Sequence, residues 1–120
     1  MKLKEILKVI EAEPFYLHKQ NELENEFNYI SATDLMSDAL AMVCAKSTET
    51  ILLTGLANTQ SIRTAEMLDI TNIIFVRSKI PAEDVVALAK ESGCNLFMCT
   101  LSMYEACGEL YSLGLRTATK

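Results

Sequence analysis

The chain has 120 residues, half of them apolar, with no tryptophan and a formal net charge of −5. This length predicts one domain over residues 1–120, because domains commonly run to about 100–150 residues. Nucleic-acid binding needs a basic stripe that neutralises phosphates, and the sequence has none. No apolar run approaches the roughly 18–20 residues that span a bilayer, and the N-terminus lacks the pattern of a signal peptide. We therefore expect a cytoplasmic protein without nucleic-acid or membrane partners.

The cysteines and the single histidine do not form a recognisable metal or catalytic pattern. No C-x-x-C pair occurs, and His18 lies in a polar segment apart from any cysteine, so neither a zinc site nor Cys-His catalysis is predicted. The four cysteines, expected to be free thiols, are Cys44, Cys94, Cys99 and Cys107.

The first thirty residues predict a helix followed by short strands. Apolar residues recur at helical spacing over residues 2–12, and Pro14 ends that pattern. Residues 15–17 and 27–30 favour strands, and the polar stretch 18–27 favours an exposed turn. The place of these strands in a sheet cannot be derived from the sequence.

A second helix is predicted to begin at Thr33-Asp34, whose side chains can accept hydrogen bonds from first-turn amides. From residue 39 to residue 45 it has no polar side chain. A helix that is apolar nearly all round must be covered on more than one side. Its own sheet is one cover, and the other is a second subunit or, alternatively, the N-terminal helix. The predicted homodimer interface consists of Met36, Leu40 and Val43.

Three apolar, β-branched runs follow at residues 51–54, 73–76 and 95–99, separated by amphipathic stretches. Strands that alternate with helices predict parallel βαβ units. The expected fold is therefore α/β, a layered single domain with a mainly parallel sheet flanked by helices.

Local signals place the ends of the later helices. Asn58 is a good N-cap, Pro81 suits a first turn, and Gly93 suits a left-handed stop. Ser102 opens an S-x-x-E capping box. Residues 116–120 are expected to be a frayed tail.

Polar segments follow each predicted parallel strand, and parallel strands bring such segments to one edge of a sheet. A small anionic ligand is the sharper hypothesis for this edge, with Arg77 and Lys79 holding its charge. The alternative is that several of these side chains serve as helix caps, or as a solvated helix face at Asp34 and Asp38. The candidate ligand-binding residues are Thr33, Asp34, Asp38, Thr54, Asn58, Arg77, Ser78, Lys79 and Thr100.

The glycine at position 55 does not begin a phosphate loop. The residue five positions after Gly55 is Gln60, and no lysine follows it. The dinucleotide pattern G-x-G-x-x-G is also missing, so no cofactor and no metal are predicted.

The order and spacing of four sequence blocks resemble the DRTGG domain over residues 27–115. The blocks are ATDLMSDALAMV, LLTGLANTQSIRTAEMLDI, FVRSKIPAEDVVALAKESG and MYEACGELYSLG. Arg77-Ser78-Lys79 occupies the approximate place of the signature and lacks its two glycines. The resemblance implies a fold similar to the N-terminal domains of HPr kinase/phosphorylase and of Mur ligases, and it implies a homodimer.

These observations favour a non-catalytic regulatory or binding module that senses a small anionic metabolite or a nucleotide. The alternative is a protein–protein interaction module, a dimerisation or scaffold domain without a ligand. A phosphotransfer enzyme is less favoured, because Asp34 or Asp38 would have to hold a metal ion without a phosphate cradle.

Overall fold

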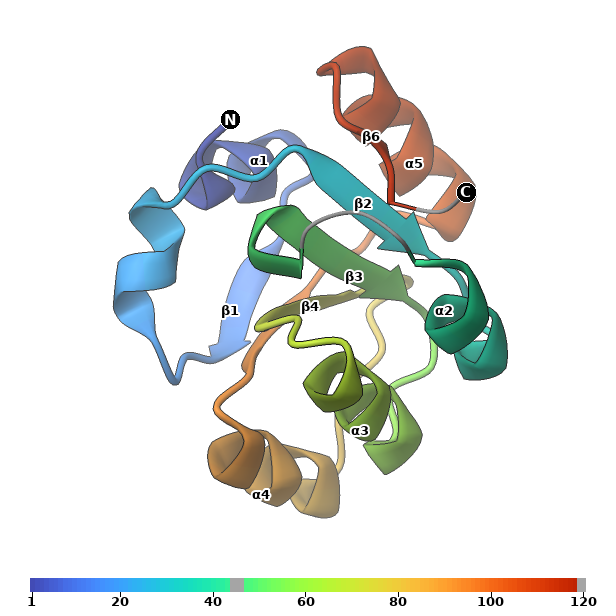
Figure 1. Cartoon of the computed structure of the whole chain (residues 1–120). Coiled ribbons are helices and arrows are strands. Elements are labelled where there is room, and N and C mark those ends of the chain that lie inside the picture. Colours follow the sequence, from blue (N-terminus) through green and yellow to red (C-terminus); the bar gives the residue numbers. More distant parts are fainter. Residues whose placement is uncertain (44–46, 119–120) are drawn as a thin grey trace.

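The structure, a computed structural model, describes residues 1–43 and 47–118. One six-stranded sheet lies between two layers of helices, in the order β1-β5-β4-β3-β2-β6 (Figure 1). The strands are β1 (Glu13–Tyr16), β2 (Tyr29–Ala32), β3 (Thr50–Thr54), β4 (Asn72–Phe75), β5 (Asn95–Met98) and β6 (Arg116–Thr117). The α-helices are α1 (Leu3–Val9), α2 (Met36–Met42), α3 (Thr59–Met67), α4 (Glu83–Ser92) and α5 (Met103–Ser112), and the 3₁₀ helices are η1 (Gln20–Glu24) and η2 (Ser47–Glu49).

The sheet confirms the predicted α/β class. Strands β5, β4, β3, β2 and β6 run parallel, and β1 is antiparallel to β5. Every residue of β3 and β4 is buried, because helices cover both faces of these central strands. This double burial explains their continuous apolar runs.

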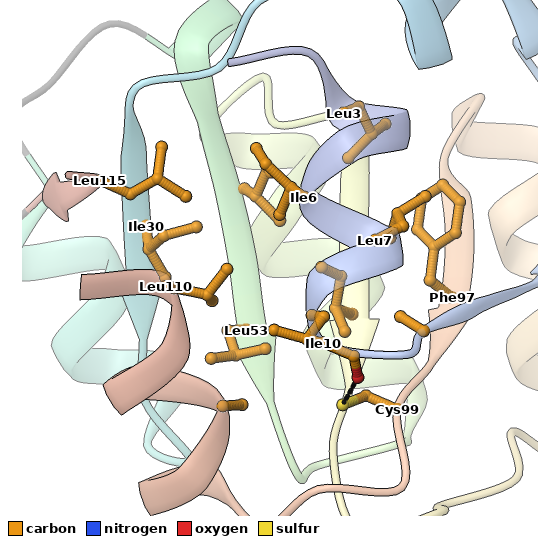
Figure 2. Close-up of a cluster of buried hydrophobic side chains, with 14 of the residues drawn as sticks. Leu3, Ile6, Leu7, Ile10, Ile30, Leu53, Phe97, Cys99, Leu110 and Leu115 are labelled. Atoms are coloured by element: carbon orange, nitrogen blue, oxygen red, sulfur yellow. Dashed lines mark hydrogen bonds between the residues drawn. The ribbon is translucent and has the colours of Figure 1, made fainter. Parts of the chain in front are cut away.

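Two hydrophobic clusters fill the two sides of the sheet. Helices α1 and α5 cover one side, where Phe97, Leu53 and Ile74 are fully buried with the apolar face of α1 (Figure 2). The Cys99 thiol donates a hydrogen bond to the Ile10 carbonyl oxygen over 3.2 Å in this cluster. Helices α2, α3 and α4 cover the other side, where Met36 packs in the second cluster.

The last residues correct one prediction. Residues 116–118 do not fray, because β6 pairs in parallel with β2 and Ala118 is buried. The Ala118 amide donates to the Ile30 carbonyl oxygen over 2.9 Å. Residues 119–120 lie outside the described part of the chain. A two-residue strand carries too little periodicity to be seen in a sequence.

The start of α2 corrects a second prediction. The helix begins at Met36 and Leu35 is its N-cap residue, whereas we expected the start at Thr33-Asp34. The Thr33 hydroxyl accepts a hydrogen bond from the Leu35 amide before the helix begins, and the Asp34 carboxylate is engaged elsewhere.

The other helix signals hold with one exception. Asn58 and Ser102 cap α3 and α5 through their side chains, and Gly93 ends α4 with a φ of 77°. Pro81 lies before the Ala82 N-cap and therefore outside the first turn of α4.

The predicted dimer surface on α2 is smaller than expected. Met36 is buried in the core of its own chain, whereas Leu40 is 41% exposed and Val43 is partly buried. The N-terminal helix α1 lies on the opposite face of the sheet and does not supply the second cover (Figure 1). Cys44 falls outside the described residues. The homodimer therefore stays a prediction, and Met36 is not available to a partner.

Cys94 gives a pH-dependent contribution to stability. Burial, with a smaller contribution from Glu66, raises the pKa of its thiol from 9.0 to about 11. A raised pKa means that the folded state holds the proton more tightly than the unfolded state between these values. We expect this contribution to be complete below pH 9 and to be lost as pH rises to about 11, a difference on the order of 3 kcal/mol.

Urea unfolding at several pH values between 8 and 11 measures this loss. Cys94→Ala is the matched control, and the wild type should lose more stability than this variant over the interval. If the free energies of unfolding of the two proteins fell equally over this pH interval, the assignment of the effect to Cys94 would be wrong.

Candidate functional site

The four parallel strands β2 to β5 end at one edge of the sheet, as the sequence predicted. Along this carboxyl edge, the segments that follow β5, β4, β3 and β2 begin at Cys99, Val76, Gly55 and Thr33. Such an edge is where open α/β sheets hold their ligands.

A polar network joins three of these strand ends. One carboxylate oxygen of Asp34 accepts hydrogen bonds from the Gly55 amide over 2.6 Å and from the Thr54 hydroxyl over 3.2 Å. The other oxygen lies 3.8 Å from the Arg77 guanidinium. Asp34, Thr54 and Arg77 were all candidate ligand-binding residues, and the fold brings them together.

The ion pair in this network is weak. The side chains of Asp34 and Arg77 are 48% and 47% exposed, and exposed pairs of this kind contribute about 0–1 kcal/mol. The two hydrogen bonds from Gly55 and Thr54 hold the Asp34 carboxylate more firmly than Arg77 does. Arg77 can therefore exchange its partner at little cost.

The backbone around Arg77 is unusual. Arg77 and Ser78 both have positive φ, at 59° and 54°, a conformation that costs non-glycine residues roughly 1–2 kcal/mol. Their amides donate to the carbonyl oxygens of Leu101 over 2.8 Å and Cys99 over 2.9 Å. These bonds fasten the connection after β4 to the segment after β5 and so fix where the Arg77 side chain leaves the backbone.

Gly55 makes room for the guanidinium. A Cβ atom at this position would collide with the end of the Arg77 side chain and would lie 3.3 Å from the Asp34 carboxylate. The sequence pattern indicates only that Gly55 does not begin a phosphate loop, and it does not indicate this role. No local signal in the sequence indicates which distant side chain crosses a glycine.

A second group of residues lines a hollow of about 280 Å³ beside this network. Ser78 and Thr100, both predicted as site residues, face it together with Glu11 and Glu13. Helix α4 leaves β4 toward one face of the sheet, and α5 leaves β5 toward the other. The hollow therefore lies at the point where the chain directions diverge, which is the usual ligand crevice of such sheets.

The other candidates do not take part in the Asp34 network and do not line the hollow. Asn58 accepts a hydrogen bond from the Ser61 amide over 3.2 Å as the N-cap of α3. Thr33 bonds to the Leu35 amide, and Asp38 and Lys79 are exposed. The predicted site thus divides into a network at Asp34, a hollow at Ser78 and a set of separate side chains.

Within residues 1–43 and 47–118, no three His, Cys, Asp or Glu side chains are grouped closely enough to hold a metal ion. No helix in the same part of the chain has both the length and the apolar character needed to cross a membrane.

Comparisons with known proteins give a likeness of fold. No family model and no curated protein matches the chain. It is similar to a crystal structure of the CBS and DRTGG domains of the regulatory region of Clostridium perfringens pyrophosphatase, complexed with the activator diadenosine tetraphosphate. The TM-score is 0.68 with 14% identity, over 91% of this chain and 45% of that chain.

This likeness supports the fold that the DRTGG resemblance implied. At 14% identity it concerns the fold alone, and the chain spans less than half the length of the pyrophosphatase region.

Proposed function

We propose that this protein is a non-catalytic regulatory module that binds a small anionic metabolite or a nucleotide at the carboxyl edge of its sheet. The observation that carries the proposal is the placement of Arg77. Its guanidinium is half-exposed, lies at the meeting point of three strand ends and has one weak ionic partner at 3.8 Å.

The Arg77 guanidinium supports an anionic ligand. A guanidinium presents five N–H donors in a planar fork that suits carboxylates and phosphates. The Gly55 amide and the Thr54 hydroxyl donate to the Asp34 carboxylate and hold it in place without help from Arg77. An oxyanion that approaches Arg77 therefore competes with Asp34 for a guanidinium that Asp34 holds only weakly.

The adjacent hollow favours a nucleotide over a simple anion. Glu11 and Glu13 accept hydrogen bonds, and the Ser78 and Thr100 hydroxyls can donate or accept them. Sugar hydroxyls and base amino groups are suitable partners for such a surface, whereas a phosphate is not. A ligand with its phosphate on Arg77 and its hydroxyls toward the two glutamates satisfies both regions. The nucleotide activator bound in the pyrophosphatase region is consistent with this class.

Isothermal titration with adenine nucleotides, acetyl phosphate and inorganic pyrophosphate tests the proposal. We expect at least one of these anions to bind, and Arg77→Gln to weaken its binding by about tenfold, the usual effect of losing one charge-assisted contact. Arg63→Gln is the matched control, because Arg63 is an exposed arginine in the middle of α3. If no anion binds, or if both variants lose affinity equally, the proposal is wrong.

Gly55→Ala probes the same geometry without removing a charge. The added methyl group displaces the end of a flexible side chain, so the cost in stability should be small while the Arg77 guanidinium moves away from Asp34. Binding affinity should fall while the unfolding midpoint changes little. Unaltered binding in this variant would contradict the placement of the ligand beside Gly55.

A protein-interaction function is the second candidate, favoured by the exposed apolar side chains of α2 and its N-cap. Leu35 is 57% exposed and Leu40 is 41% exposed. Leu40→Glu should abolish capture of a protein partner and leave anion binding intact. If Leu40→Glu still captured the partner in a pull-down and lost anion binding in a parallel titration, this surface would be excluded.

A further inference from the structure

The edge of the sheet opposite the strand exits contains a hollow of about 140 Å³. It lies where β2, β3 and β4 begin, and its walls come from η1, from the segments just before these strands and from the start of β4. Apart from Phe27, the described residues that line it are polar. This volume suits a small polar molecule, since one water occupies about 30 Å³ of the liquid. We call it the amino-edge hollow.

A buried amide side chain forms part of the wall of the amino-edge hollow. Asn72, the first residue of β4, has no exposed surface. Its side-chain nitrogen Nδ2 has no hydrogen-bond partner among residues 1–43 and 47–118. Buried polar groups in native proteins are nearly always paired, because an unpaired buried donor is costly. The Asn72 amide is therefore a donor that requires an acceptor from outside the described chain.

Asn95 fixes which atom of Asn72 is left without a partner. The amides of His18 and Lys19 donate to the Asn95 side-chain oxygen over 2.7 and 2.8 Å, so its Nδ2 is the atom that reaches Asn72. This nitrogen donates to the Asn72 side-chain oxygen over 2.8 Å. If the Asn72 amide were turned over, two NH₂ groups would meet. The remaining Nδ2 of Asn72 is thus held as a donor, and its ligand must offer an acceptor.

Two carboxylates, Glu22 and Asp69, line the same hollow. The Asn25 side-chain amide donates to one oxygen of Glu22 over 3.0 Å and holds it in place. Neither carboxylate forms an ion pair within the described residues. Two negative charges without a cation repel anions and attract a positively charged donor. The charge requirement of this hollow is therefore opposite to that of Arg77 at the other edge.

We propose that the amino-edge hollow binds a primary ammonium group with a carbonyl oxygen beside it, the chemistry of an α-amino amide or of a peptide N-terminus. The three N–H donors of the ammonium group meet Glu22 and Asp69, and the carbonyl oxygen accepts from Asn72. A bare cation would leave the Asn72 donor unpaired, and a free amino acid would bring a third carboxylate. The proposal does not rest on anion binding at Arg77.

Nuclear magnetic resonance titration of the full chain with glycinamide tests this site. We expect saturable shifts of the Asn72 side-chain amide signals, with a dissociation constant on the order of millimolar because the probe is so small. Acetamide has the carbonyl without the ammonium, and tetramethylammonium has the charge without N–H donors. Each should bind at least about tenfold more weakly than glycinamide, since it lacks the charge-assisted hydrogen bonds.

Variants that remove one charge each test the role of the carboxylates. Glu22→Gln and Asp69→Asn should each weaken glycinamide binding by about tenfold. Both changes preserve the side-chain shape, and asparagine tolerates the φ of 58° at position 69, so the unfolding midpoint should stay unchanged. Glu91→Gln, at an exposed position of α4, is the matched control and should bind glycinamide like the wild type.

A longer probe identifies the source of the ligand. If triglycine amide binds as tightly as glycinamide, the hollow accepts a peptide N-terminus, and if glycinamide alone binds, it accepts a free amino amide. The proposal is overturned if glycinamide leaves the Asn72 signals unchanged, which would mean that water alone pairs with this amide. It is also overturned if acetamide binds equally well, or if both carboxylate variants bind like the wild type.

Discussion

Phe97→Ala is expected to lower the free energy of unfolding by about 4 kcal/mol, the usual cost of removing a fully buried phenylalanine. Phe97 lies on β5 with no exposed surface and faces the layer formed by α1, next to Leu7 (Figure 2). The loss combines the transfer of the ring to water with the cavity it leaves, because the neighbouring strands cannot collapse inward. Guanidinium unfolding followed by circular dichroism measures it.

Phe15→Ala is the matched control, because Phe15 lies on the edge strand β1 and is 40% exposed. We expect this change to cost less than about 1 kcal/mol, as surface substitutions usually do. A loss below about 1.5 kcal/mol for Phe97→Ala, or equal losses for the two variants, would mean that the cluster beneath α1 is not the dominant core.

Asn95→Ala is expected to cost about 3 kcal/mol, because one buried amide satisfies a whole set of polar groups. The Asn95 side-chain oxygen accepts from the amides of His18 and Lys19 over 2.7 and 2.8 Å. Its amide nitrogen donates to the Lys19 carbonyl oxygen and to the Asn72 side chain. Alanine leaves these groups without their partner at the start of β5.

The same unfolding experiment measures this effect, with Asn21→Ala as the control, because Asn21 is exposed in η1. Hydrogen exchange gives a second reading: the His18 and Lys19 amides should exchange much faster in Asn95→Ala than in the wild type. If the protection of these two amides were unchanged, Asn95 would not be the residue that holds His18 and Lys19 in place.

The sequence predicted the central sheet well, because its signals are local and strong. The apolar runs of β3, β4 and β5 and the cap residues Asn58 and Ser102 each carry a physical signature within a few residues. The order of the outer strands was not predictable. Antiparallel pairing of β1 with β5 depends on packing between distant segments, and β6 consists of two residues.

The candidate site was predicted in part for the same reason. Topology alone brings the exits of parallel strands to one edge, so the meeting of Asp34, Thr54 and Arg77 follows from the fold. Ser78 and Thr100 line a hollow together with Glu11, and this grouping depends on the position of β1 in the sheet. Which side chain crosses Gly55 depends on two positive φ angles at Arg77 and Ser78, and no sequence signal marks them.

The two borders of the sheet come from opposite ends of the chain. Strand β1 pairs with β5, and β6 pairs with β2, so both outer pairings join segments that are far apart in sequence. Contacts of this kind slow folding, because long loops must close before any pairing energy is gained. During synthesis, β3 and β4 leave the ribosome before β1 can pair with β5 and before β6 can pair with β2. A growing chain therefore exposes the unpaired edge of β2 until residues 116–117 have left the ribosome, and it is prone to aggregate during this period.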